Sequence, residues 1–217
     1  MIWGARNEGS REPFKTKAQP SLLEPGWAHT EDGWSLPLWR CAPQPGATGE
    51  PIILAADLCL GPQSMDFQAD RSLVRYFHER GYDVFVFGHR GVPDAVAPRS
   101  KTSVDYDSIV RHDVPAAIQA VRAMTQARRV HWIGHGFGGQ CLVGHLASDG
   151  ADDLAAGALL SAPVKFRPYK STLRRAARVA SYLPDAWSLP VNRIQEVLTV
   201  ASRTSDLSTY TCRVEGP

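Results

Sequence analysis

The sequence predicts an α/β domain built on a doubly wound, mostly parallel sheet. Short apolar runs alternate with segments of helical periodicity, which is typical of βα units that place helices on both faces of a sheet. A glycine-rich turn joins one of these runs to the helical segment that follows it. The chain has 217 residues, of which 43% are hydrophobic and 21% charged, as expected for one globular domain of ordinary size.

The chain begins with an expected arm and hairpin. Residues 1–24 are polar and charged with few apolar residues, so we expect an N-terminal arm here and the folded core over residues 25–164. Asp32-Gly33 lies between two short mixed runs. An Asp-Gly pair in that position predicts a β-hairpin.

Four apolar runs then predict buried parallel strands, at residues 51–56, 84–87, 130–133 and 157–160. Between them, Asp70 is expected to cap a helix over residues 71–80, and Gly81 to end it in a left-handed conformation. A longer helical segment covers residues 106–126, where Pro115 either starts or kinks the helix. Its apolar positions recur at helical spacing: Val114, Ala117, Ile118 and Val121. A further helix is expected over residues 138–147.

The alternation of strands and helices stops after Pro163. Residues 165–217 hold two helical patterns, around 173–182 and 192–202, and then a polar tail. We interpret this region as the start of a helical lid. The sheet is therefore expected to stop after its sixth strand and to leave an apolar edge that a protein partner could cover.

Composition argues against several classes of protein. A net charge of +2, from 24 basic and 22 acidic residues, is too balanced for a dedicated nucleic-acid-binding protein. We see no apolar stretch of membrane-spanning length and no secretory signal, and therefore expect a cytoplasmic protein. The four cysteines lack C-x-x-C spacing, so we expect reduced thiols and assign no metal or cofactor.

One motif carries the chemistry. The run 130–133 leads into Gly134-His135-Gly136-Phe137-Gly138, which is similar to the G-x-S-x-G nucleophile elbow on a strand-to-helix turn. Three more segments accompany it in order: residues 51–76, 81–91 and 105–117. Together they resemble the α/β-hydrolase superfamily, in its lipase and polyhydroxyalkanoate-synthase-like branch. The resemblance implies a pocket above Gly136 for a small acyl or ester ligand.

The sequence departs from this family at two places. Gly136 stands where the family has Ser, Asp or Cys, and the family's acid and histidine would follow later strands, after residue 217. We therefore expect an α/β-hydrolase-like protein without hydrolytic activity, in a binding or scaffold role. The alternative is a serine ester or thioester hydrolase, or an acyltransferase, whose nucleophile was mutated and whose C-terminus was lost. No catalytic residue is assigned. The candidates for an oxyanion or ligand pocket are Leu58, His89, His135, Gly136 and Phe137, and an oxyanion-like nest would use the amides of Phe137 and of a residue near Leu58.

In a second alternative, the same turn is interpreted as a dinucleotide-binding site. Residues 134–139 satisfy G-x-G-x-x-G between a strand and a helix. That fingerprint needs an acidic residue about 20 positions further on, but here the next strand ends in Ser161-Ala162-Pro163.

The other candidate residues have structural interpretations. We expect His135 to be a neutral packing histidine, Arg90 to tie its turn through backbone carbonyls, and Cys141 to be a buried spectator. Cys59, in the loop after the first apolar run, lacks a base to deprotonate it. A basic cluster is interpreted as a solvated helix face: Lys165, Arg167, Lys170, Arg174, Arg175 and Arg178.

Overall fold

The computed structural model describes residues 22–47, 49–58, 61, 64–66, 71–92, 94–99, 103–149 and 152–164. All of them belong to one compact unit, Met1–Phe166. The expectations for most of the arm, for the lid and its basic cluster, and for Cys59 concern residues outside these ranges.

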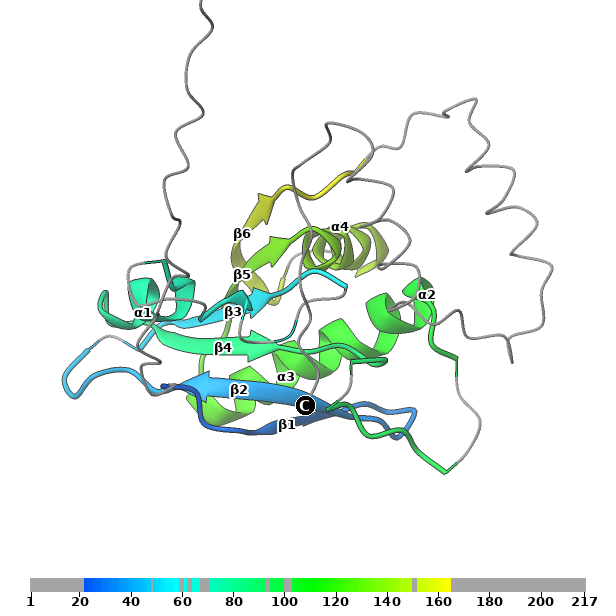
Figure 1. The fold of residues 1–217 in the computed structure, drawn as a ribbon, viewed down its shortest axis with the longest axis horizontal. Helices are drawn as coiled ribbons and strands as arrows, with labels where there is room; N and C mark the ends of the chain where they lie inside the picture. Colours follow the sequence, from blue (N-terminus) through cyan, green and yellow to red (C-terminus); the bar gives the residue numbers. More distant parts are fainter. Residues whose placement is uncertain are drawn as a thin grey trace, which may run out of the picture. The chain divides into compact units, whose positions relative to one another are not determined.

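The described part of the chain forms a six-stranded sheet in the order β1-β2-β4-β3-β5-β6 (Figure 1). The strands are β1 (Trp27–His29), β2 (Ser35–Cys41), β3 (Pro51–Ala55), β4 (Asp83–Phe87), β5 (Val130–His135) and β6 (Leu154–Leu160). Strands β4, β3, β5 and β6 are parallel, while β2 runs antiparallel to both β4 and β1. This topology confirms the predicted parallel core and the hairpin across Asp32-Gly33.

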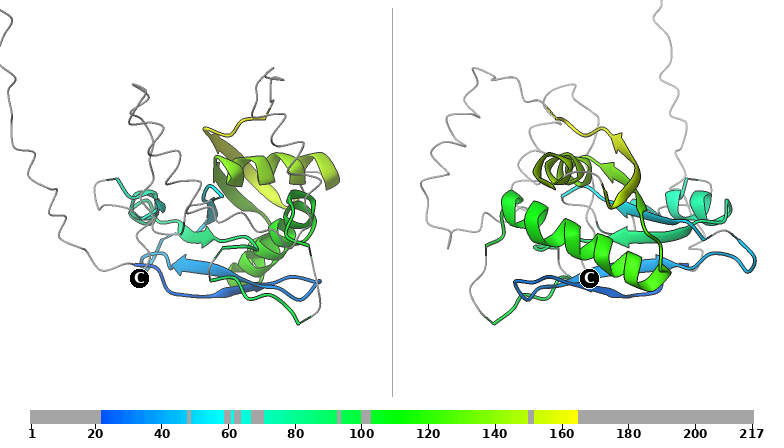
Figure 2. Two further views of the ribbon diagram at one scale, coloured as in Figure 1. Left: turned by 45° about the vertical axis from the view of Figure 1, so that its right-hand side comes forward. Right: turned by 180° about the vertical axis from the view of Figure 1, so that it is seen from behind.

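Helices cover both faces of the sheet. Helix α1 (Leu73–His78) packs on one face, and α3 (Val114–Thr125) and α4 (Phe137–Asp149) lie together on the other (Figure 2). Alternate residues of a strand point to opposite faces, so Val84 and Val86 of β4 pack toward α1 while Phe85 and Phe87 pack toward α3. Both faces are thus apolar, which explains the uninterrupted hydrophobic runs.

The start of α1 corrects one prediction. The N-cap is Ser72 and not Asp70: the Ser72 hydroxyl accepts a hydrogen bond from the Arg75 amide at 3.0 Å and donates one to Asp66 at 2.6 Å. Serine and aspartate are equally good caps, and the helix begins two residues later than we predicted. Gly81 follows the helix with φ +83°, and its amide donates to the His78 carbonyl, as expected.

The long helical segment contains a widened turn. It comprises α2 (Tyr106–Ser108), a π-helical turn η2 (Ile109–Asp113) and α3. Pro115 lies in the first turn of α3, where a missing N–H is tolerated. Pro115 is thus the second residue of α3, and α3 continues directly from the π-helical turn, because Asp113 and Val114 both have helical backbone angles. The four apolar positions predicted in this segment are all buried.

Strand β6 forms the edge of the sheet in the described residues. It pairs with β5, and residues 155–160 are exposed. Leu159 and Leu160 keep 43% and 40% of their surface accessible. None of the helices in this part of the chain is long and apolar enough to cross a membrane.

Candidate functional site

The candidate site lies at the turn between β5 and α4, where the carboxyl ends of the parallel strands meet. Gly136 occupies the turn with φ +52°, a conformation that favours glycine. Its amide donates to the Leu160 carbonyl at 2.9 Å, and its carbonyl accepts from the Gln140 amide at 3.2 Å. A side chain at Gly138 would collide with the Ala55 carbonyl group. Glycine there lets α4 start directly against the end of β3.

The Asp57 carboxylate fills the space in front of Gly136. Its Oδ1 accepts hydrogen bonds from the amides of Leu58 and Phe137, both at 2.8 Å. A Cβ placed on Gly136 would lie 2.6 Å from each Asp57 carboxylate oxygen. These are the two amides expected around the elbow, and the structure brings them together on a carboxylate that the sequence analysis did not single out.

His89 lies beside this arrangement, after the end of β4. Its side chain is buried, its ring packs against Phe137 with centroids 5.2 Å apart, and its Nδ1 lies 2.5 Å from the Arg90 carbonyl oxygen. Since a carbonyl only accepts, Nδ1 carries the proton and Nε2 of the neutral ring is an acceptor. Nε2 is buried and has no hydrogen-bond partner in the described part of the chain. Burial lowers the pKa of His89, against opposing effects from the Arg90 carbonyl, Asp113, Asp57 and the Leu58 backbone.

Two other predicted pocket residues contribute less. The Leu58 side chain is 51% exposed, so this residue adds its amide to the turn and an apolar surface beside it. His135 is half-buried at the end of β5, opposite Leu160 in the register. Its ring makes no hydrogen bond to any residue that the structure describes.

Arg90 has a structural role, although its partners differ from those we expected. The side chain is fully buried, and its guanidinium donates to the carboxylates of Asp113 and Asp32 at 2.7–3.0 Å. The Ser103 carbonyl is a further acceptor at 3.0 Å. Most hydrogen bonds of the guanidinium therefore go to carboxylates, because a fully buried cation needs opposite charges beside it. The group joins the hairpin turn at Asp32 to the start of α3.

Cys141 lies on α4, pointing into the core. It is 2% exposed, and burial raises the pKa of its thiol to about 12. Cys41 is also buried, with a pKa raised by burial to about 11. Such thiols are poor nucleophiles at neutral pH, which agrees with a spectator role for Cys141.

The geometry disfavours a dinucleotide at the glycine turn. The amide of Phe137, which would have to face a pyrophosphate, donates to Asp57. A phosphate placed there would meet a carboxylate instead of free amides. Among the described residues, no group of three or more His, Cys, Asp or Glu side chains is arranged to hold a metal ion.

An open depression lies elsewhere on the described surface, around the end of α3. It is lined by Gln119, Arg122, Ala123, Gln126, Ala127 and Arg128. This segment precedes β5, so the depression is at the amino ends of the parallel strands. Ligands of open α/β sheets bind at the carboxyl ends, which favours the elbow as the site.

The parallel sheet, the helices on both faces and the tight strand-to-helix turn define an α/β-hydrolase domain. More narrowly, residues 67–211 match the model of the serine aminopeptidase family S33, and the chain belongs to this family. No curated protein matches the chain.

Solved structures share the fold. An esterase from Exiguobacterium antarcticum superposes with a TM-score of 0.55 and 20% identity, covering 73% of this chain and 55% of that one. An epoxide hydrolase from Vigna radiata gives a TM-score of 0.57 and 18% identity, covering 90% of this chain and 62% of that one. Epoxide hydrolase A from Mycobacterium thermoresistibile gives 0.50 and 20%, with coverages of 73% and 44%. The chain thus spans about half the length of these proteins.

Proposed function

We propose that this chain binds a small ligand at the elbow without hydrolysing it, as a pseudoenzyme of its family. One observation carries the proposal: the residue that should supply the attacking atom is Gly136, and the Asp57 carboxylate fills the space that a side chain there would need. Removing the nucleophile of a triad hydrolase lowers kcat by about 10⁶.

The hydrogen bonds of the turn support the same conclusion. Hydrolysis of an ester needs free donors aimed at the developing oxyanion. The amides of Leu58 and Phe137 already donate to Asp57 Oδ1, so an oxyanion would have to displace a carboxylate. This elbow is therefore arranged to hold an internal anion and not to stabilise a transition state.

The test is a search for turnover and for covalent labelling. The purified chain is incubated with p-nitrophenyl butyrate and, separately, with a fluorophosphonate probe, beside a heat-killed sample. We expect neither turnover nor labelling above the heat-killed control. Activity that persists through purification and disappears in an Asp57→Asn variant would overturn the proposal, because it would locate catalysis at this turn.

A second candidate is an ester or thioester hydrolase, or an acyltransferase, whose nucleophile has been replaced. The family match over residues 67–211 favours it. Restoring the serine needs room, since a Cβ on Gly136 would lie 2.6 Å from both Asp57 oxygens. The test is the double variant that combines Gly136→Ser with Asp57→Gly. It is made in this chain and in a chain extended through its reading frame. Turnover of p-nitrophenyl butyrate would support this candidate, and silence in both would remove it.

Two finer expectations belong to the first proposal. The ligand would be a small molecule held above Gly136, in a protein located in the cytoplasm. A protein partner would lie along β6, whose residues 155–160 are exposed in the described structure.

A further inference from the structure

Two backbone amides at the elbow converge on one negatively charged oxygen. The Leu58 amide, just after β3, and the Phe137 amide, at the first residue of α4, both donate to Asp57 Oδ1 at 2.8 Å. Because α4 begins here, the positive end of its dipole faces the same oxygen. Converging N–H groups of this kind bind anions. The elbow therefore holds a carboxylate, which the chain itself supplies.

The Asp57 carboxylate is held differently from five other aspartates of the structure. Those five each pair with an arginine: Asp32, Asp66, Asp83, Asp113 and Asp153. Within the described ranges, no arginine or lysine forms an ion pair with Asp57, and its side chain is only half-buried. A second carboxylate could therefore replace it by accepting the same two hydrogen bonds, with no ion pair to break.

Gly136 provides the space for such an exchange. A Cβ on this residue would lie 2.6 Å from both oxygens of Asp57, so glycine is needed to leave room for a carboxylate in front of the turn. If the Asp57 side chain turns away, the volume that it leaves has the shape of a carboxylate group. The carboxylate of a small ligand fits there for the same reason that Asp57 does.

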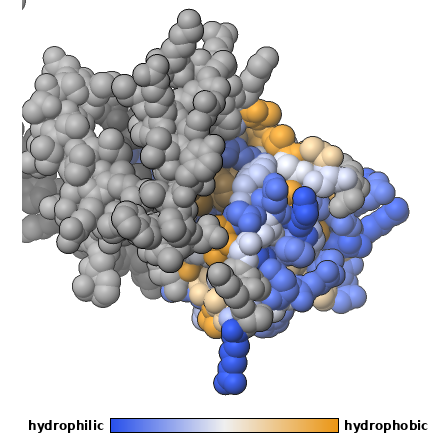
Figure 3. All heavy atoms as spheres, turned by 90° about the vertical axis from the view of Figure 1, so that its right-hand side faces the viewer, coloured by the Kyte–Doolittle hydropathy of each residue, from blue (hydrophilic) through white to orange (hydrophobic). Residues whose placement is uncertain are grey.

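Two exposed leucines lie next to the turn. Leu58 donates one of the two amides, and the Leu160 carbonyl accepts a hydrogen bond from the Gly136 amide at 2.9 Å. The two leucines are 51% and 40% exposed. Figure 3 looks onto this side of the molecule and shows hydrophobic patches among hydrophilic ones. A carboxylate that carries a short alkyl chain matches this combination of amide donors and apolar surface.

We propose that Asp57 is an exchangeable internal ligand of the elbow, whose carboxylate leaves the amides of Leu58 and Phe137 when the carboxylate of an incoming alkanoate binds them. This inference rests on the proposed non-hydrolytic function, to which it adds the ligand class and the regulation of the site. An ester is a poorer competitor, because hydrogen bonds to an ionised acceptor are about twice as strong as those to a neutral one.

The tether of Asp57 makes the exchange depend on ligand concentration. A tethered group has an effective concentration on the order of millimolar or more at its binding position, so a dilute alkanoate leaves the internal contact in place. The displaced carboxylate also stays nearby and repels the negatively charged ligand. Removing the Asp57 side chain should therefore increase the affinity of the elbow for an alkanoate.

The test removes the internal ligand and supplies an external one. In Asp57→Ala the amides of Leu58 and Phe137 lose their acceptor, and their ¹H–¹⁵N resonances should shift from the wild-type positions. Titration with n-butyrate at pH 7 should return both resonances toward those positions, with an apparent Kd about ten-fold lower than in the unmodified chain. Equal Kd values in the two proteins, or no response of these amides, would overturn the inference. Methyl butyrate should act more weakly than n-butyrate, and an equal response would also contradict it.

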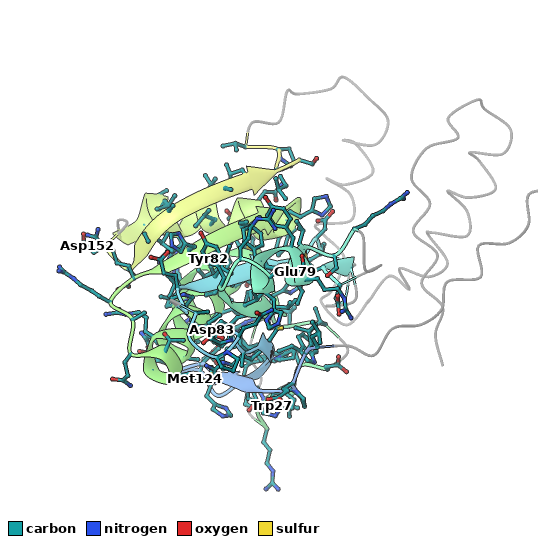
Figure 4. All side chains as sticks on the ribbon, turned by 90° about the vertical axis from the view of Figure 1, so that its left-hand side faces the viewer. Trp27, Glu79, Tyr82, Asp83, Met124 and Asp152 are labelled. Carbon is teal, nitrogen blue, oxygen red and sulfur yellow. The ribbon has the colours of Figure 1, made fainter. Side chains whose placement is uncertain are left out.

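Two control variants remove other carboxylates. Asp105→Ala removes one that accepts a single amide, that of Ser108 at 2.7 Å. Asp152→Ala removes an exposed charge just before β6, on the side of the molecule where β4 begins at Asp83 (Figure 4). Both variants should bind n-butyrate no more tightly than the unmodified chain. A gain in either that equals the gain in Asp57→Ala would show that losing any negative charge is enough, and would refute the exchange.

A second substitution covers the case in which Asp57→Ala does not fold. Asp57→Asn keeps the size of the side chain, and its neutral oxygen is a weaker acceptor, so n-butyrate should bind more tightly than in the unmodified chain. Unchanged affinity would overturn the inference. The ester and fluorophosphonate assays on the same samples separate the two proposals: silence there with no n-butyrate binding defeats only the inference, whereas labelling at the elbow of the unmodified chain defeats the proposed function.

Discussion

Replacing Gly136 by alanine tests the packing of Asp57 against the turn. The new Cβ meets two costs. The backbone at φ +52° penalises a residue with a Cβ by about 1–2 kcal/mol. The contact of 2.6 Å with both Asp57 oxygens adds about 1–3 kcal/mol, whether the turn shifts or the carboxylate moves off its two amides. We therefore expect Gly136→Ala to lower the free energy of unfolding by about 2–5 kcal/mol.

A double-mutant cycle separates the two costs. In an Asp57→Ala background the contact is gone, so Gly136→Ala should cost only the backbone term of about 1–2 kcal/mol. Gly46 provides the matched control, because it has φ +84° and nothing lies within 4 Å of a Cβ built on it. Gly46→Ala should cost the same in both backgrounds.

The assay is urea unfolding of the single and double variants, followed by tryptophan fluorescence and circular dichroism. We expect a coupling of about 1–3 kcal/mol between positions 57 and 136, with none between 57 and 46. Additivity of Gly136→Ala and Asp57→Ala within about 0.5 kcal/mol would refute the reasoning, since it would mean that the carboxylate does not occupy the space in front of the turn.

Three further predictions concern charges and thiols. Burial of Asp32 raises its pKa, but hydrogen bonds from Arg90 and Thr30 outweigh this and lower it overall. Its contribution to stability is therefore present above about pH 4 and is lost as the pH falls through the lowered pKa. Asp32→Asn should cost about 1–3 kcal/mol at pH 7 in urea unfolding, and a difference from wild type that does not decrease as the pH falls below about 4 would contradict this. The lowered pKa of His89 predicts stability that is complete above about pH 6.5 and decreases below it; His89→Gln should flatten this part of the pH profile, and an unaltered slope would exclude His89 as its source. Cys141, with a pKa of about 12, should resist iodoacetamide at pH 8 in the folded protein and react in urea; peptide mass spectrometry would detect labelling in the native state, which would contradict its burial.

Most strands could be predicted because each face of the sheet is covered. Residues such as Val84 and Phe85 lie in separate hydrophobic clusters on opposite faces, so the run is apolar throughout and visible in the sequence. The boundaries of the helices were harder to predict from the sequence. Ser72 and Asp70 are both suitable caps, and the choice depends on the tertiary contact of Ser72 with Asp66, which local sequence does not encode.

The site was only partly predictable. The sequence placed the turn, the empty nucleophile position and the amides near Leu58 and Phe137. It did not show that Asp57 turns back onto them, because this contact joins residues 80 positions apart. The available signal was the combination of an acid just after the first parallel strand and a glycine at the elbow. That the two lie side by side is a property of the folded structure, which the sequence alone does not show.

The buried Arg90 has a consequence for the order of folding. Its guanidinium joins Asp32, 58 positions earlier, and Asp113, 23 positions later. One of the two carboxylates that neutralise the buried guanidinium is therefore supplied by a contact across a long loop, and such loops close slowly. The parallel core and the start of α3 should assemble before the first hairpin docks. Variants at Asp32 should then speed unfolding more than they slow refolding.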